Sequence, residues 1–168
     1  NPEFENCLLM ILKKDPNAYI LLSNAIPFCQ SHLKRLKNKF DNYLSRIRWF
    51  PTLDKFQYME IISICDVILD PFPFGGCNTS FEAFDLNIPV ITLPSQYLNG
   101  NFTAGLYKKM GITDTIAVSM EDYVNKCFEI VYNQKLRNKI VREIHCKKDS
   151  IFLEKESVEE WYSFLMKC

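Results

Sequence analysis

Two short apolar runs without polar alternation constrain the fold of this 168-residue chain more than any other feature. They are residues 66–70 (DVILD) and 89–93 (PVITL), and strands of this kind are buried on both faces, as in parallel sheets. Further strands are expected over 18–22, 46–49 and, more weakly, 114–118. Segments with helical spacing separate these runs, so the pattern predicts βαβ units and an α/β fold with a parallel sheet.

Helix signals fill the gaps between the expected strands. Asp54 is placed to cap a helix over 55–63, and Ser119 with Asp122 resembles a capping box that opens a helix ending near 133. Gly111 is expected to end the helix before it. The remaining helices are expected over 4–12, 33–44, 81–86, 102–110, 134–147 and 157–166. In the last of these, we expect the aromatic cluster at 161–165 to pack onto a core.

The composition excludes several classes of protein. Twenty basic and twenty acidic residues give a net charge of zero, so no electrostatic excess favours nucleic acid or an anionic membrane. The basic stretch 34–39 carries leucines at helical spacing and is expected to be a solvated helix face. No apolar run approaches the length of about 20 residues that a membrane span needs. Seven scattered cysteines without a Cys-x-x-Cys pair favour reduced thiols of a cytosolic protein over a zinc site.

The first expected element is a helix, although a doubly wound sheet usually has its first strand in the middle. Two interpretations remain open at this point. Either the fold begins differently, or the chain is the later part of a longer protein whose first strand lies upstream.

Chemistry is concentrated after the buried strand at 66–70. Gly75 and Gly76 form a turn that leads into a helix, where Thr79 and Ser80 add hydroxyl groups. Free N–H groups at a helix N-terminus favour an anion, and glycines allow a phosphate to approach closely. Glu82 could accept hydrogen bonds from a ribose. The alternative is a plain tight turn with capping residues, because glycine-rich turns are weak motifs.

Residues 69–94 (LDPFPFGGCNTSFEAFDLNIPVITLP) resemble the signature of the cytosolic O-linked N-acetylglucosamine transferases. This group includes the plant SPINDLY-type enzymes and, more distantly, bacterial cytoplasmic N-glucosyltransferases. The likeness extends upstream through 11–22 and 47–53 (IRWFPTL) and downstream through 111–112 and 119–123 (SMEDY), so it covers most of the chain.

The resemblance implies a GT-B glycosyltransferase. Residues 1–168 would form its C-terminal Rossmann-like domain, with a mostly parallel sheet flanked by helices and without its first strand. The implied function is inverting, UDP-sugar-dependent glycosyl transfer to a protein or peptide acceptor in the cytoplasm. An N-terminal domain missing from this chain would complete the enzyme, and no cofactor or metal would be needed. The isolated chain is expected to be inactive alone.

The resemblance also implies roles for individual residues. The backbone at Cys77, Asn78 and Thr79, with the Thr79 hydroxyl, would hold the diphosphate, and Glu82 takes the position of the acidic ribose ligand. The remaining nucleotide-sugar-binding positions are Lys55 and Tyr58 beside the nucleotide, and Gly75, Gly76 and Ser80 in the loop. No catalytic residue can be assigned.

Several positions depart from the family pattern. Cys77 replaces a histidine of the animal enzymes, Asn78 a threonine, and Ile61 and Asn101 replace arginines. Asp70, which ends the strand, is expected to hydrogen-bond the loop backbone rather than act in catalysis. The missing cationic groups motivate an alternative function, a non-catalytic Rossmann-like module that binds a nucleotide or docks a protein partner.

Overall fold

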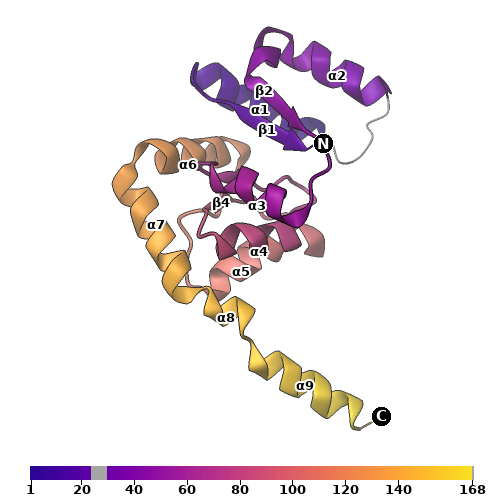
Figure 1. Ribbon diagram of the computed structural model, residues 1–168, viewed down its shortest axis with the longest axis vertical. Coiled ribbons are helices and arrows are strands. Elements are labelled where there is room, and N and C mark those ends of the chain that lie inside the picture. The colour runs from indigo at the N-terminus through magenta and orange to yellow at the C-terminus, as the bar shows by residue number, and fades with distance from the viewer. Residues whose placement is uncertain (24–29, 168) are drawn as a thin grey trace.

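The computed structural model describes residues 1–23 and 30–167 and has a mixed α/β fold (Figure 1). Short strands alternate with helices in the first two thirds of the chain, and only helices follow. The strands are β1 (Ile20–Ser23), β2 (Ile47–Phe50), β3 (Ile68–Leu69) and β4 (Val90–Ile91). The helices are α1 (Pro2–Lys14), α2 (Gln30–Phe40), η1 (Asp41–Arg46), α3 (Lys55–Ser63), α4 (Asn78–Asp85), η2 (Leu98–Gly100), α5 (Phe102–Lys109), α6 (Met120–Tyr132), α7 (Gln134–Lys147), α8 (Asp149–Phe152) and α9 (Lys155–Leu165). None of the described helices is both long and apolar enough to cross a bilayer.

The strands form two small parallel sheets rather than one. Strand β1 pairs with β2, with Ile20 opposite Ile47, and β3 pairs with β4, with Ile68 opposite Val90. The strand expected over 114–118 is reduced to a single parallel bridge between Thr92 and Ile116. The prediction of parallel pairing is therefore confirmed. The prediction of one mostly parallel sheet is confirmed only in part, because the strands form two separate parallel pairs.

The local signals for helix ends are confirmed. Asp54 caps α3 by accepting a hydrogen bond from the Gln57 N–H (2.9 Å), and the Gln57 side chain completes the capping box. The Ser119 hydroxyl accepts from the Asp122 N–H (3.1 Å) at the start of α6. Gly111 follows α5 with a φ of +65°, in the left-handed region that glycine tolerates best.

Each sheet has its own apolar core. The larger core packs α4, α5 and α6 around β4, and its fully buried rings include Phe84, Tyr107 and Tyr123. The Tyr107 hydroxyl accepts a hydrogen bond from the Val90 N–H (2.7 Å), which satisfies both polar groups inside the core. The smaller core lies beside β1 and β2, where the basic helix α2 buries Leu36 and Phe40 and exposes Lys34 and Lys37. The solvated basic face is therefore confirmed for Lys34 and Lys37.

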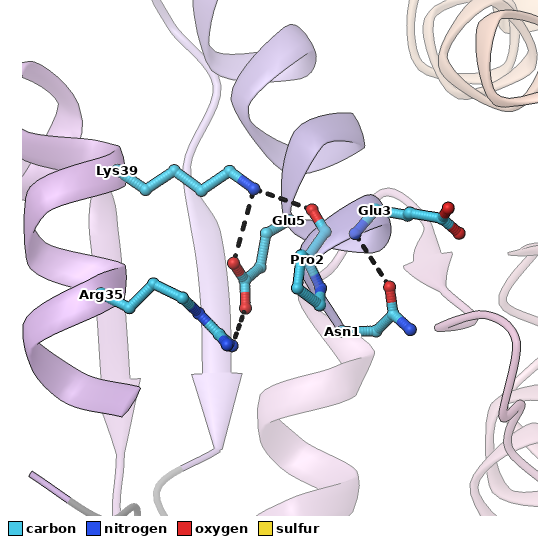
Figure 2. Close-up of polar contacts among 6 residues, drawn as sticks. All are labelled: Asn1, Pro2, Glu3, Glu5, Arg35 and Lys39. Carbon is cyan, nitrogen blue, oxygen red and sulfur yellow. Dashed lines mark hydrogen bonds and ion pairs between the residues drawn. The ribbon is translucent and has the colours of Figure 1, made fainter. Parts of the chain in front are cut away.

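A buried carboxylate joins α1 to α2 (Figure 2). The Glu5 side chain is 6% exposed, and its two oxygens lie 2.7 Å from Arg35 Nη2 and 3.5 Å from Lys39 Nζ. Lys39 Nζ also donates to the Pro2 carbonyl (2.7 Å). The neighbouring Glu3 carboxylate points away from both cations (Figure 2). A buried carboxylate without partners is costly, so the two cations make the position of Glu5 tolerable.

The last helix contradicts its sequence-based prediction. Trp161, Tyr162, Phe164 and Leu165 are 60–66% exposed instead of packing onto a core. The helix α9 extends away from the body of the molecule beyond α8 (Figure 1). Its apolar side therefore has no surface to bury against among the described residues, although its amphipathic spacing is that of a packed helix.

We predict that Glu5→Ala lowers the free energy of unfolding by about 1–3 kcal/mol, because it removes hydrogen bonds to charged groups. Glu3→Ala is the matched control, and its exposed carboxylate predicts a change within about 0.5 kcal/mol. Urea unfolding followed by circular dichroism measures both. Equal losses in the two variants would contradict the role of the ion pair.

Candidate functional site

Asp70 organises the loop that joins β3 to α4. Its N–H continues the parallel ladder to the Ile91 carbonyl (2.9 Å), while its side chain turns back into the protein. One carboxylate oxygen accepts from the Gly76 N–H (2.5 Å), and the other accepts from the Thr92 hydroxyl (2.7 Å). The Tyr123 hydroxyl donates to the Asp70 carbonyl (3.0 Å). These contacts confirm that Asp70 holds the loop backbone.

The Asp70 carboxylate is buried, with 4% of the residue exposed. Burial raises the pKa of Asp70 above its ordinary value of 3.8, because it penalises the charged form, while the hydrogen bonds from Gly76 and Thr92 act in the opposite direction. The desolvation effect is the larger one. The group that holds the loop is therefore a carboxylate whose ionisation costs stability.

Both glycines of the loop sit where a side chain would be crowded. A Cβ on Gly75 would lie 3.1 Å from an Asp70 carboxylate oxygen, and one on Gly76 would overlap the Thr79 hydroxyl. Their N–H groups are already used, by the Asn99 carbonyl (3.1 Å) and by Asp70 (2.5 Å). Gly75 and Gly76 therefore let neighbouring groups come close to the backbone of the loop, but their N–H groups are not free to bind a ligand.

The N-terminus of α4 presents unused donors. In the described part of the chain, the N–H groups of Cys77, Asn78 and Thr79 have no intramolecular acceptor. Asn78 and Thr79 are exposed and Cys77 is half-buried, so no side chain plugs this end of the helix. The helix macrodipole adds to these donors, and together they favour an anion.

The first turn of α4 differs from its sequence-based prediction in one respect. The helix was expected over 81–86, whereas it begins at Asn78, so that Asn78, Thr79 and Ser80 are its first three residues and Cys77 occupies the cap position without a side-chain bond. Ser80 points inward, and its hydroxyl lies 2.7 Å from that of buried Thr103. Thr79 is thus the exposed hydroxyl that remains available at the helix start.

Helix α3 supplies the other predicted residues and packs against α4. Tyr58 is half-buried, and burial together with the nearby Glu82 carboxylate raises the pKa of its phenol. Tyr58 and Glu82 are thus within electrostatic reach of each other across the two helices. Lys55 is exposed in the first turn of α3. Lys55 and Tyr58 therefore lie one turn apart on α3, and α3 packs against the helix that carries Glu82.

Sequence reasoning missed the loop at 95–101, which supports the glycine turn. The Ser95 hydroxyl donates to the Pro73 carbonyl (3.1 Å), and Asn99 accepts from Gly75. A Cβ on Gly100 would collide with the Pro73 carbonyl, so this glycine permits the two loops to touch. Asn101 donates through Nδ2 to the Ser95 and Tyr97 carbonyls (both 2.6 Å). The sequence feature that could have indicated this loop contact is Gly100, in a chain with five glycines.

Two of the departures from the family pattern have structural roles. Asn101, where the resemblance expects a cation, holds the 95–101 loop. Ile61 is half-buried and lines a large cavity that also contacts Tyr58 but none of residues 75–82. The cavity and the α4 N-terminus are therefore separate features.

The described cysteines are free thiols, as expected. Cys7 and Cys127 are buried, and burial raises the pKa of their thiols to about 11 and about 12. Such thiols are unreactive at neutral pH. Cys77 is half-buried and Cys146 is exposed, while Cys29 and Cys168 lie outside the described residues.

Comparison with known proteins identifies distant relatives of this chain. A UDP-glucose:protein N-beta-glucosyltransferase of Actinobacillus pleuropneumoniae is 27% identical over 89 residues, which cover 52% of this chain and 14% of that protein. A probable UDP-N-acetylglucosamine–peptide N-acetylglucosaminyltransferase SPINDLY of Oryza sativa is 25% identical over 128 residues, or 71% of this chain and 13% of the relative. The chain thus spans only a small part of either protein. No protein-family model matches it.

The fold has a solved counterpart. A mutant O-GlcNAc transferase of Thermobaculum terrenum superposes with a TM-score of 0.80 at 21% identity, over 90% of this chain and 30% of that one. The sequence and fold comparisons agree. This chain is a distant homologue of the SPINDLY-type O-GlcNAc transferases and of the bacterial protein N-glucosyltransferase.

We predict that stability carried by Asp70 declines as pH rises. Its folded pKa lies above 3.8, so the native state binds more protons than the unfolded state in the window just above pH 3.8. The stability of the natural chain relative to Asp70→Asn should therefore fall through this window and become constant above the folded pKa. Urea unfolding at a series of pH values measures the difference. A difference that rises with pH would contradict the burial effect.

Proposed function

We propose that this chain is the nucleotide-sugar-binding domain of a UDP-sugar-dependent protein glycosyltransferase. In this proposal residues 1–168 form one Rossmann-like unit of a two-domain GT-B enzyme. The observation that carries the proposal is the open N-terminus of α4, with its unused N–H groups beside the Thr79 hydroxyl. The homology to enzymes named as using UDP-glucose or UDP-N-acetylglucosamine supports it.

The diphosphate would lie on the backbone of Cys77, Asn78 and Thr79. An anion at a helix N-terminus gains about 0.3–1 kcal/mol from the macrodipole, and each N–H adds a charge-assisted hydrogen bond. Gly76 keeps side-chain atoms away from this approach. The buried Asp70 carboxylate faces inward to the Gly76 N–H and Thr92, so its negative charge is screened from the phosphate by the loop that it holds.

The ribose and base would lie toward α3. Glu82 is half-buried on the helix that carries the phosphate site, and it is a suitable acceptor for a ribose diol. Tyr58 is half-buried on α3, which packs against α4, and it offers an aromatic face for the uracil ring. Lys55, one turn earlier on α3, is long enough to add a positive charge near the nucleotide.

The proposed chemistry is inverting transfer, in which an acceptor nucleophile attacks the anomeric carbon and UDP departs with the bonding electron pair. The role of this chain is to stabilise the negative charge that develops on UDP. Preorganised N–H donors are effective for this because they need no reorganisation during the reaction. With these donors and Lys55 to neutralise the diphosphate, the proposal requires no metal ion.

A second function remains a candidate because of two observations. Ile61 and Asn101 stand where the resemblance expects cations, and Asn101 is occupied in supporting a loop. A site with fewer cations suits a non-catalytic module that binds a nucleotide weakly or docks a protein partner. Direct measurement of UDP binding separates the two functions.

We predict that the chain binds UDP, UDP-N-acetylglucosamine or UDP-glucose in isothermal titration calorimetry. Thr79→Ala combined with Glu82→Ala should weaken UDP binding about 100-fold, since each residue supplies a hydrogen bond to a charged or polar partner. Thr113→Ala combined with Glu121→Ala is the matched control, because both residues are exposed outside α3 and α4. Undetectable UDP binding by the natural chain would favour the docking module.

We also predict that residues 1–168 alone transfer little sugar to protein even where UDP binds. The acceptor must be oriented against the donor, and orientation supplies a large part of the rate enhancement. Mass spectrometry of acceptor peptides after incubation with the UDP-sugar measures transfer. Efficient transfer by this chain alone would show that no facing domain is needed.

A further inference from the structure

Thr103 is a buried residue that contacts the glycine turn and that the proposed function does not use. It lies in the first turn of α5 and is 1% exposed. Its hydroxyl oxygen lies 2.7 Å from the hydroxyl oxygen of Ser80 in α4 and 3.3 Å from the carbonyl oxygen of Gly76. The first turns of α4 and α5 and the turn before α4 are therefore joined through this one hydroxyl group.

The acceptors in this cluster determine where its hydrogens lie. A hydroxyl has one hydrogen to donate, and a carbonyl oxygen can only accept. Thr103 therefore donates to the Gly76 carbonyl, and Ser80, which is 2% exposed, donates to Thr103. Both hydroxyl hydrogens are used inside the protein, so the Ser80 side chain supports Thr103 rather than facing a ligand.

Both backbone groups of Gly76 are held by buried side chains. Its N–H donates to Asp70 (2.5 Å), and its carbonyl accepts from Thr103 (3.3 Å). The Thr103 hydroxyl also lies near Asp70, since burial raises the pKa of Asp70 and a hydrogen bond from Thr103 is among the effects that lower it. Glycine has no Cβ to restrict its backbone angles, so these contacts supply the orientation that a side chain would otherwise help to fix.

The contact to the Gly76 carbonyl also sets the direction of the next N–H group. The peptide unit between Gly76 and Cys77 is trans, so its C=O and N–H point in opposite directions within one plane. Because the carbonyl points toward buried Thr103, the Cys77 N–H points away from it. This N–H has no intramolecular acceptor in the described part of the chain, and it is the first of the free donors at the start of α4.

We propose that Thr103 is a positioning residue for the diphosphate site, because it holds the Gly76–Cys77 peptide with its N–H turned toward the ligand. The inference rests on the proposed function for the identity of that ligand. Without the Thr103 hydroxyl the peptide plane could rotate, and its carbonyl oxygen could then face the phosphate oxygens, which repel another acceptor. A donor that is oriented beforehand binds an anion without a cost of reorganisation.

The test separates the hydroxyl of Thr103 from its volume. Thr103→Val keeps the size of the side chain and removes the hydroxyl, whereas Thr103→Ser keeps the hydroxyl and removes a methyl group. In titration calorimetry, UDP should bind about tenfold more weakly to Thr103→Val and within about twofold of the natural affinity to Thr103→Ser, since only the first variant loses the hydrogen bond. Ser80→Ala leaves the Thr103 hydroxyl in place and should show a smaller loss than Thr103→Val.

Uridine, which lacks the diphosphate, distinguishes positioning from a general loss of structure. Thr103→Val should weaken the binding of UDP but not that of uridine, measured by NMR titration at millimolar uridine. Thr115→Val is the matched control, because Thr115 is also buried and its hydroxyl makes no hydrogen bond to the described residues 75–80. This control should leave both affinities unchanged.

The free chain tests the orientation of the peptide without any ligand. The Cys77 amide should give one sharp NMR resonance in the natural chain and in Thr103→Ser. In Thr103→Val, where the peptide plane can rotate, the resonance should be broadened or doubled. An unchanged Cys77 resonance in Thr103→Val would overturn the inference.

The binding measurements can contradict the inference separately. UDP binding that Thr103→Val leaves intact would overturn it while the proposed function stands. Equal losses for UDP and uridine, or a Thr103→Ser variant as weak as Thr103→Val, would show that packing rather than the hydroxyl matters and would overturn it as well. Failure of the natural chain to bind UDP would overturn the proposed function, and the Cys77 resonance would still decide the orientation of the peptide.

Discussion

The carboxylate of Asp70 is the interaction on which the candidate site depends. It ends β3, accepts a hydrogen bond from the Gly76 N–H, and receives the Thr92 hydroxyl from the neighbouring strand. These contacts fix the loop between β3 and α4 with respect to the sheet, and so they aim the N-terminus of α4. A buried carboxylate is an expensive group for this role, but its two oxygens hold a backbone donor and a side-chain donor at once.

Much of the local structure could be predicted from the sequence, because it depends on neighbouring residues. The bounds of α7 agree with the predicted range of 134–147, and the caps at Asp54 and Ser119 form as expected. The roles of Asn78 and Ser80 could not be predicted in detail. They depend on where helix α4 begins and on Thr103, which lies 23 residues beyond Ser80 in the chain.

Features that depend on distant partners were harder to foresee. The sequence contains strand signals of the right kind and order, but it does not show that β1 and β3 remain apart. Helix α9 has the spacing of a packed helix, yet spacing alone cannot reveal whether a partner surface exists. The 95–101 loop supports the glycine turn through backbone carbonyl groups. Every residue has such a group, so the residue types do not reveal these contacts.

The candidate site and the cavity share helix α3. Tyr58 lines the cavity and is within electrostatic reach of Glu82, while Lys55 begins the same helix. Ile61 and Ile62 of α3 also line the cavity, next to the turn that carries Tyr58. The position of α3 therefore affects both the proposed nucleotide face and the apolar wall of the cavity.

The hydroxyl of Tyr107 gives the second sheet two unlike borders. It accepts the Val90 N–H with a side chain from α5, so the outer border of β4 is closed there, and among the described residues it pairs onward through the bridge at Thr92. In the same part of the chain, the border of β3 away from β4 has no side chain that closes it in this way. Exposed strand borders are templates for strand addition. A further strand would therefore extend this sheet at β3 and not at Val90 of β4.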